Sequence, residues 1–287
     1  MNRMVKKRLV VAFPASVIAD TPHLREKTAK IGYIGRAAAI FKVDEIIVYA
    51  DDPKTNQRRD LDLIATWLNY METPQYLRKR LFELKPELQF AGILPPLRTP
   101  HHPLKGNIRD LKVGDYREGV VVSKAKGGVL VDIGSESPVL VYGAQVDVNK
   151  RLTLKIVKLG EKVEVQVVDR SAVPMYWGFT VNVENHSIKT LLEDPRFDLI
   201  VGTSKFATSF QDAAKSLSEK WAKANTVLLL FGAPTRGLFE IAKDHRLNIH
   251  DIVDFMLNTL PNQGTETVRT EEAFMATLAI FNVQFEF

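Results

Sequence analysis

The stretch Thr226-Val-Leu-Leu-Leu-Phe-Gly-Ala-Pro-Thr-Arg-Gly-Leu238 decides the fold of this chain. It opens with an unbroken apolar run of strand length, which ends at Gly232 and Pro234. A continuous apolar run is typical of a strand covered on both faces, so we expect a mostly parallel sheet in an α/β fold. Ligands bind such sheets at the loops that leave the carboxyl ends of the strands. The segment after Phe231 is therefore predicted to belong to a ligand site.

Two further segments have the composition of strand-end loops. Asn258-Thr-Leu-Pro-Asn-Gln-Gly264 is polar and carries proline and glycine, and Thr270-Glu-Glu-Ala273 then opens a helix of small residues that runs to Phe281. A third candidate, Gly202-Thr-Ser-Lys-Phe206, directly follows the buried strand predicted at Asp198–Val201. We expect the three loops to converge on one crevice, because the carboxyl ends of parallel strands share one edge of the sheet.

The N-terminal part reads as a βαβ unit. Strands are predicted at Arg8–Phe13 and Val43–Tyr49, and a helix of small and apolar residues is predicted at Lys30–Phe41 between them. Arg36 on this helix is a candidate ligand for a phosphate or a base edge, because its forked guanidinium stays charged. An ordinary arginine on the helix surface is the competing interpretation.

These segments resemble the motifs of the SPOUT, or α/β-knot, methyltransferases. Phe231–Leu238 resembles the second motif of that family, and Asn258–Gly264 together with Thr270–Ala273 resembles the third. Gly32 and Arg36 match positions of the first motif. The amino-acid sequence of the third segment is similar to that of one branch of the family, the RNA methyltransferases of archaea and eukaryotes that carry an inserted OB-like domain.

The resemblance implies a fold, a cofactor and partners. It implies a mostly parallel sheet with a C-terminal trefoil knot and S-adenosylmethionine as the methyl donor. It also implies a homodimer with the site near the interface, in which Arg36 acts in catalysis on the partner's cofactor. The eukaryotic relatives imply N3 of a uridine in ribosomal RNA as the acceptor. The residues themselves do not choose between base and ribose methylation.

The candidate cofactor-binding residues lie in the three loops and at the start of the last helix. Glycines at these positions let the backbone approach an adenosine closely, hydroxyl and amide side chains supply polar contacts, and a leucine packs on the adenine. The set is Gly202, Thr203, Gly232, Arg236, Gly237, Asn258, Leu260, Gln263, Gly264 and Thr270. Each glycine taken alone could equally be a simple turn.

Two features depart from a complete catalytic site. Where the family continues its Gly-Thr-Ser loop with Glu-Arg-Gly, this chain has Lys205, Phe206 and Ala207, so a ligand arginine is missing. Glu271 and Glu272 are the candidates for a general base, and they are equally well explained as first-turn carboxylates that the helix dipole favours.

In the middle of the chain, apolar residues recur with a period of two, which is typical of β-strands. Arg98-Thr-Pro-His-His-Pro103 reads as a linker, and five short strands follow between residues 116 and 168. Five short antiparallel strands favour a small OB-like barrel. We therefore predict an all-β insert at residues 98–171 and a discontinuous methyltransferase domain at residues 1–97 and 172–287.

The charge of the insert suggests a role in RNA binding. Between Arg98 and Arg170 there are 13 Lys and Arg against 9 Asp and Glu, whereas the whole chain has a net charge of +5. This excess can form a surface that tracks phosphates. A solvated face on a purely structural insert is the alternative.

Composition excludes several classes. The chain has 287 residues, 45% of them hydrophobic, and no cysteine, which removes disulfides and thiolate chemistry. No histidine spacing suggests a metal, and no apolar run is long enough to span a membrane. The absence of a phosphate-loop motif argues against a P-loop NTPase. Residues 1–8 lack the features of a signal peptide, so we expect a cytoplasmic protein.

Two other functions compete with methyl transfer. One is a non-catalytic RNA-binding or ribosome-assembly factor that keeps the knot as a scaffold, which the altered loop after Ser204 favours. The other is an unrelated α/β enzyme that binds a nucleotide. Calorimetry with S-adenosylmethionine separates the three.

Overall fold

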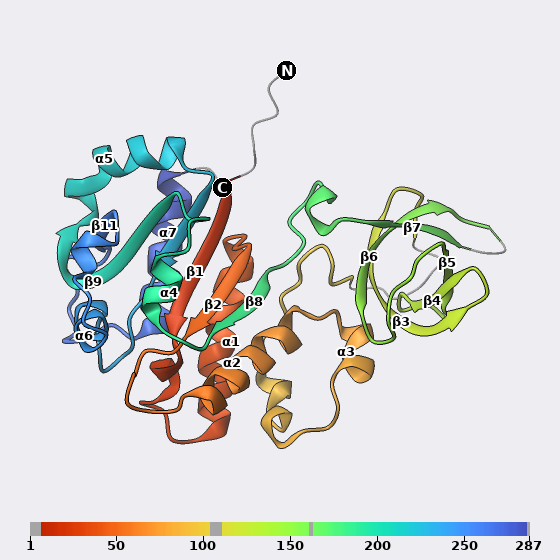
Figure 1. Ribbon diagram of the computed structural model, residues 1–287, viewed down its shortest axis with the longest axis horizontal. Helices are drawn as coiled ribbons and strands as arrows, with labels where there is room; N and C mark the ends of the chain where they lie inside the picture. Colours follow the sequence, from red (N-terminus) through yellow and green to blue (C-terminus); the bar gives the residue numbers. More distant parts are fainter. Residues whose placement is uncertain (1–6, 104–110, 161–162, 286–287) are drawn as a thin grey trace. The chain divides into compact units, whose positions relative to one another are not determined.

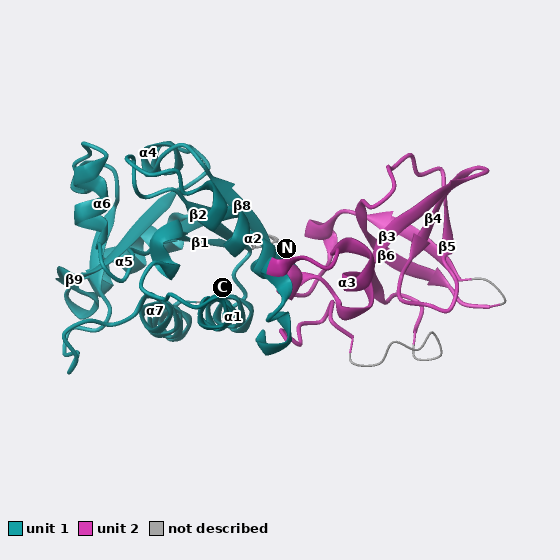
Figure 2. Ribbon diagram, turned by 90° about the horizontal axis from the view of Figure 1, so that it is seen from below, with its two compact units in different colours: residues 1–69, 87–95, 179–287 teal, residues 70–86, 96–178 magenta. Residues whose placement is uncertain are grey.

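The computed structural model describes residues 7–103, 111–160 and 163–285. The chain divides into two compact units (Figure 2). Unit 1 comprises residues 1–69, 87–95 and 179–287, and unit 2 comprises residues 70–86 and 96–178. Unit 2 thus includes residues 70–86, which the predicted insert at 98–171 left out. Residues 1–6, on which most of the signal-peptide argument rests, lie outside the described part.

Unit 1 is built on a six-stranded sheet in the order β11-β9-β10-β1-β2-β8 (Figure 1). Every neighbouring pair is parallel, as the apolar run at Thr226 predicted. The strands are β1 (Arg8–Pro14), β2 (Glu45–Tyr49), β8 (Thr180–Glu184), β9 (Leu199–Ser209), β10 (Thr226–Leu230) and β11 (Phe255–Asn258). β10 and β1 lie at the centre and are buried along most of their length.

Helices cover both faces of this sheet. The α-helices that begin in unit 1 are α1 (Leu24–Ile40), α2 (Arg58–Glu72), α4 (Ile188–Leu192), α5 (Phe210–Lys223), α6 (Leu238–Asp244) and α7 (Thr270–Gln284). Short 3-10 turns occur at Ala15–Ile18, Ala91–Ile93 and Ile249–Asp251. Figure 2 shows α1 and α7 next to each other on one side of the sheet, with α4 and α6 on the other.

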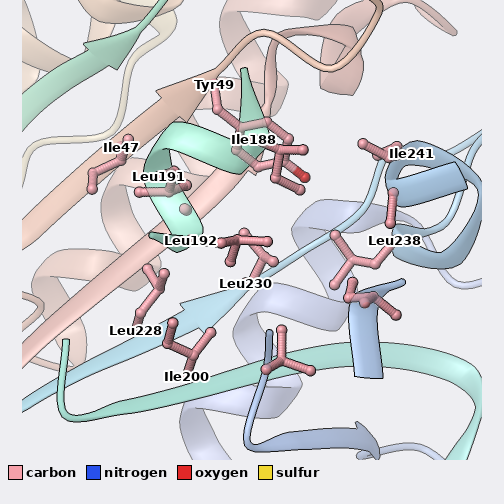
Figure 3. Packing of buried hydrophobic residues seen from close by; sticks show 14 of the residues in the cluster. Ile47, Tyr49, Ile188, Leu191, Leu192, Ile200, Leu228, Leu230, Leu238 and Ile241 are labelled. Carbon is pink, nitrogen blue, oxygen red and sulfur yellow. The ribbon is translucent and has the colours of Figure 1, made fainter. Parts of the chain in front are cut away.

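Alternation along the strands explains the two layers. Leu228 and Leu230 on β10 point to the face of α4 and α6, where they join Ile188 and Ile241 in one apolar cluster (Figure 3). The intervening residues point to the opposite face. There Phe274 of α7 packs edge-on against Phe13, with ring centroids 6.3 Å apart. α7 is apolar on most of its surface, which suits a helix packed against both the sheet and α1.

Two features of this edge of the sheet were not predicted. β11 occupies Phe255–Asn258, where the sequence suggested only a connection that leads to a loop. β9 continues through the predicted Gly202–Phe206 loop to Ser209, but with an interrupted register. Gly202 pairs with Met256, whereas the next residue of β11, Leu257, pairs with Thr208. Residues 203–207 therefore form a long bulge between these two pairs.

Unit 2 contains a five-stranded antiparallel sheet in the order β5-β4-β3-β6-β7. Its strands are β3 (Tyr116–Ala125), β4 (Gly128–Asp132), β5 (Val139–Tyr142), β6 (Arg151–Lys158) and β7 (Glu164–Val168). The outermost strands, β5 and β7, contact each other. Buried residues alternate along the strands and form their own core, which includes Val121, Val131 and Leu154. The predicted start of β7 at Lys162 lies outside the described residues.

A buried ionic network also stabilises unit 2. The carboxylate of Glu72, 3% exposed, accepts hydrogen bonds from Arg151 at 2.6 Å and Arg170 at 2.8 Å. The imidazoles of His101 and His102 lie 2.9 and 2.7 Å from the backbone carbonyl oxygen of Glu72. Burial raises the pKa of Glu72, but Arg151, His101 and Arg170 outweigh it and lower the pKa to about 2. The network joins the end of α2 to β6, and α3 (Gln75–Leu81) contacts the same sheet through the hydrogen bond from Tyr76 Oη to the carbonyl oxygen of Glu118 at 2.8 Å.

Candidate active site

A pocket of about 370 Å³ lies at the carboxyl ends of β10 and β11 in unit 1. Four segments form its walls: the bulge of β9, the turn after β10, the loop after β11 and the first turn of α7. The predicted residues among its lining are Thr203, Gly232, Gly237, Asn258, Leu260, Gln263 and Thr270. The three loops that the sequence predicted to converge thus meet in one crevice.

The turn between β10 and α6 needs a glycine at position 232. A Cβ there would lie 3.0 Å from the backbone nitrogen of Leu238 and 3.2 Å from the carbonyl oxygen of Arg236. The turn is closed by a hydrogen bond from Ala233 N to Arg236 O at 2.9 Å. Gly237 N donates to the carboxylate of Glu240 at 2.9 Å, which caps α6. The backbone therefore passes close to itself and leaves room for a ligand in front of it.

Hydroxyl groups join the turn to its neighbours. Thr203 Oγ1 donates to the carbonyl oxygen of Leu230 at 3.1 Å, and Thr270 Oγ1 donates to the carbonyl oxygen of Gly232 at 3.1 Å. Beneath the pocket, Tyr49 Oη donates to the carbonyl oxygen of Phe231 at 2.8 Å. Complete burial raises the pKa of Tyr49 well above its usual range, so this hydroxyl stays protonated. These bonds fix the carbonyl groups that end β10.

The loop after β11 is shaped by its own amides. Asn258 donates from Nδ2 to the carbonyl oxygen of Lys205 at 2.9 Å and accepts from the backbone nitrogen of Leu260 at 2.9 Å. Gln263 Nε2 donates to the carbonyl oxygen of Thr265 at 2.9 Å. Both amides hold the loop in place, and Leu260 contributes apolar surface to the pocket wall.

Four predicted residues are not among the pocket-lining residues. Gly202 is buried below the pocket, where a Cβ would lie 2.5 Å from Met256 Sδ, so this position is small because of packing. Arg236 extends to Asp51 at 2.7 Å and Asp244 at 3.0 Å. Gly264 lies in the loop after β11, where a Cβ would meet no protein atom within 4 Å. Arg36 is half-buried on α1.

The two candidate general bases have structural partners. Glu272 accepts from the backbone nitrogen of Arg269 at 2.9 Å and so caps α7. Glu271 is 12% exposed and lies 3.5 Å from the ammonium of Lys30, which is itself 6% exposed and paired with Asp20 at 2.6 Å. Glu272 therefore has the structural role that was the alternative to catalysis, a carboxylate in the first turn of a helix. Glu271 contributes to an ion pair between α7 and α1.

Several lining residues were not predicted as ligands. Lys205 and Phe206 appeared in the sequence only as a departure from a motif, yet both line the pocket. Phe239 and Glu240 on the first turn of α6 also line it. One sequence signal could have found Phe239 and Glu240, namely their position directly after the glycine turn.

The geometry defines a class: a parallel α/β protein with a small-ligand pocket at the carboxyl ends of its strands, lined by backbone groups and apolar side chains. The chain belongs to the family described as "Putative RNA methyltransferase", whose model matches residues 8–281. By family, the protein is thus an RNA methyltransferase.

Individual proteins are also similar to this chain. An uncharacterized protein of Halobacterium salinarum is 32% identical over 93% of this chain and 96% of its own length. The 28S rRNA (uridine-N(3))-methyltransferase of Mus musculus is 33% identical over 94% of this chain and 75% of its own. The SpoU methyltransferase AviRb from Streptomyces viridochromogenes superimposes with a TM-score of 0.35 and 11% identity, over 96% of this chain and 59% of that one.

The described residues also bear on membranes and metals. Each helix in residues 7–103, 111–160 and 163–285 is too short or too polar to cross a bilayer. Within the same ranges, no three His, Asp or Glu side chains are grouped so as to hold a metal ion.

Proposed function

We propose that this protein transfers a methyl group from S-adenosylmethionine to N3 of a uridine in ribosomal RNA. The observation that carries the proposal is the 33% identity to the mouse enzyme named for that reaction, which extends over 94% of this chain. The family match, over residues 8–281, includes the segments that form the strand-end pocket.

The pocket suits this cofactor. Its volume of about 370 Å³ falls in the range of small-ligand sites. Leu257, Leu260 and Val268 offer apolar surface for an adenine, and Gly232 keeps the turn open to a ribose. Bound there, S-adenosylmethionine would supply an electrophilic methyl group on a sulfonium, which needs no metal. The hydroxyls of Thr203 and Thr270 and the amides of Asn258 and Gln263 position the loops that would hold it.

The chain's remaining task is to place the acceptor and let a proton leave. N3 of a uracil carries one hydrogen, which the methyl group replaces, so a base or water has to take that proton. Glu272 is engaged as a helix cap and Glu271 is paired with Lys30. We therefore assign neither carboxylate as the base.

We also propose the finer architecture that the resemblance implies. The segment from β11 to α7 would form the trefoil knot, an assignment that the hydrogen bond between Thr270 and the turn after β10 supports. Unit 2 would be an OB-like RNA-binding module, supported by its antiparallel strand order and by the contact between β5 and β7. In this division, residues 1–97 and 172–287 transfer the methyl group and residues 98–171 position RNA. The protein would act as a homodimer, with Arg36 near the partner's cofactor.

The experiment combines binding and chemistry. The protein is titrated with S-adenosylmethionine in a calorimeter and then incubated with the cofactor and an unmodified transcript of large-subunit ribosomal RNA. Nucleoside mass spectrometry should find 3-methyluridine. Methylation of ribose or of another base would refute the acceptor assignment.

One observation favours a second candidate, a non-catalytic RNA-binding or ribosome-assembly factor. Lys205, Phe206 and Ala207 replace the Glu-Arg-Gly of the motif at the pocket itself. A protein that binds the transcript tightly but shows no heat with millimolar S-adenosylmethionine would establish this alternative.

A further inference from the structure

The bulge of β9 places a set of side chains at the wall of the pocket. Residues 203–207 lie between two consecutive pairs of β11, Gly202 with Met256 and Thr208 with Leu257. The pairing of β9 with β10 also ends at Gly202. Bulges redirect side chains and are common beside active sites. Here four of the five residues, Thr203 to Phe206, line the pocket.

Phe206 is the exposed member of this bulge. Its side chain is 79% exposed, although an aromatic ring of this size is ordinarily placed where it is at least partly covered. The backbone around it is nevertheless fixed. Asn258 donates to the carbonyl oxygen of Lys205, and the Phe206 nitrogen donates to Ser204 Oγ at 3.2 Å. The ring therefore projects from a held backbone into solvent.

Lys205 places a positive charge beside this ring. Its ammonium lies 5.1 Å from the ring centroid of Phe206 and donates to the carbonyl oxygen of Glu266 at 3.1 Å. The lysine thus connects the bulge to the loop after β11. It also covers one face of the ring with a cation and leaves the opposite face for a planar ligand.

Phe206 stands between two hollows. The second hollow, of about 470 Å³, adjoins the first and shares Phe206, Phe239 and Leu257 with it. Its other lining residues include Phe255 and His250, and the His250 ring lies 5.4 Å from that of Phe239. A ligand in the second hollow would contact Phe206 and reach the mouth of the first.

We propose that Phe206, Lys205 and the second hollow form the subsite for the acceptor nucleotide, with the uracil base stacked on Phe206. The inference rests on the proposed function, because a methyl acceptor has to lie next to the cofactor pocket. Stacking suits a base taken from single-stranded RNA, since every base has a π face. The Lys205 ammonium, on the other face of the ring, would add positive charge close to the stacked base and favour its N3-deprotonated form, because a nearby cation lowers the pKa of an acid.

The first test measures stacking without catalysis. Phe206→Trp adds an exposed indole to a protein that has three tryptophans, and Trp67, Trp177 and Trp221 are all at least 95% buried. In the presence of excess S-adenosylhomocysteine, oligouridylate should quench the added fluorescence in a saturable way. An abasic ribose-phosphate oligomer of the same length should not. Equal quenching by both, or by neither, overturns the proposal.

The second test separates this subsite from the cofactor site. Phe206→Ala should raise the KM for the ribosomal RNA transcript about tenfold or more, the effect of losing one stacked base. Phe206→Tyr should restore it, whereas Phe206→Leu, which keeps bulk without a π system, should not. Because Phe206 also lines the cofactor pocket, calorimetric affinity for S-adenosylmethionine is measured in the same variants, and in Phe206→Ala it should change by a smaller factor than the KM.

The outcomes are distinguishable. A wild-type protein that neither binds the cofactor nor methylates RNA refutes the proposed function. Normal cofactor binding with an unchanged KM in Phe206→Ala refutes the subsite alone. A change of oligomeric state in Phe206→Ala would show that a second copy covers the ring, which also overturns the proposal. Lys205→Met should shift the pH profile of kcat/KM upward, and Lys205→Arg should not.

Discussion

Thr270, on the first turn of the last helix, donates a hydrogen bond to the carbonyl oxygen of Gly232, in the turn that follows the central strand β10. The two residues are 38 positions apart in the chain, and the bond is 3.1 Å long. It links two of the four segments that form the pocket walls. The shape of the pocket therefore depends on a contact between the glycine turn and α7.

This contact gives the first prediction. Thr270→Val keeps the shape of the side chain but leaves the carbonyl oxygen of Gly232 without its donor. We expect the free energy of unfolding to fall by about 1 kcal/mol and the affinity for S-adenosylmethionine to weaken. Thermal denaturation and calorimetry measure the two effects. Thr270→Ser retains the hydroxyl and should keep the affinity; equal losses in both variants would assign the effect to packing.

The second prediction concerns the glycine itself. A Cβ at position 232 would press on the backbone of Arg236 to Leu238, so Gly232→Ala should distort the turn and abolish or strongly weaken cofactor binding. Circular dichroism should show that the fold persists. At Gly92, also in unit 1, a Cβ would meet nothing within 4 Å, so Gly92→Ala is the matched control and should bind normally. Wild-type affinity in Gly232→Ala would mean that the pocket is misplaced.

The third prediction separates stability from binding at Arg236. Its guanidinium bridges Asp244 and the fully buried carboxylate of Asp51. Arg236→Gln should lower the free energy of unfolding by about 2 kcal/mol, because a hydrogen bond to a buried charge is lost. Arg236→Lys should recover part of this loss. If the arginine bound the cofactor directly, calorimetry on Arg236→Gln would show lost affinity with unchanged stability.

The fourth prediction is acid destabilisation of unit 2 in two stages. Burial, and then the neighbouring His101, lower the pKa of His102 from 6.5 to about 4, so the unfolded chain binds a proton that the folded chain does not. Stability should therefore decrease as pH falls from 6.5 to 4. Glu72, with its pKa lowered from 4.5 to about 2, adds a second loss as pH falls through that lower range.

Chemical denaturation of the intact protein at stepped pH measures this effect. Trp177 is a suitable reporter, because its indole nitrogen donates to Glu118 at 2.5 Å within the same unit. His102→Gln keeps a donor for the carbonyl oxygen of Glu72 but does not titrate. It should remove the loss between pH 6.5 and 4 and leave the lower one. An unchanged profile would contradict the assignment to His102.

The fifth prediction tests RNA positioning by unit 2. Lys124 and Lys126 are exposed at the turn between β3 and β4. Replacing both with glutamine should reduce the slope of log affinity against log salt by about 1.4 if each contacts a phosphate of single-stranded RNA. Filter binding over a range of salt measures the slope. Lys223→Gln, on α5 of unit 1, is the control and should leave it unchanged.

The sequence predicted the sheet well because long apolar runs report burial directly. Thr226–Phe231 and the strand at Asp198 appear where the pattern placed them, and the strands in the middle of the chain begin and end within a few residues of their expected limits. β11 was missed because four residues are too few for a periodic signal. The bulge of β9 was missed because it is a shift in the pairing register between β9 and β11, which the sequence of one strand alone does not show.

The directions of the side chains in the site were harder to predict than the strands. The glycine motif predicts a turn at Arg236, but the ion partner of this arginine, Asp51, is 185 positions away in the chain. The motif therefore predicted that Arg236 binds the cofactor, because a local pattern does not show the carboxylates of Asp51 and Asp244 with which it pairs. Residues 70–86 likewise join unit 2 through Glu72 and its arginine partners, which no local pattern shows.

The bulge at residues 203–207 has a consequence for how this enzyme can diversify. Since these positions fall outside the pairing of β9 with both its neighbours, exchanging them should leave the strand register unchanged as long as Thr203 keeps its hydrogen bond to Leu230. Substrate preference could thus diverge between species, or be redesigned in the laboratory, by replacing residues 204–207 on an unchanged scaffold.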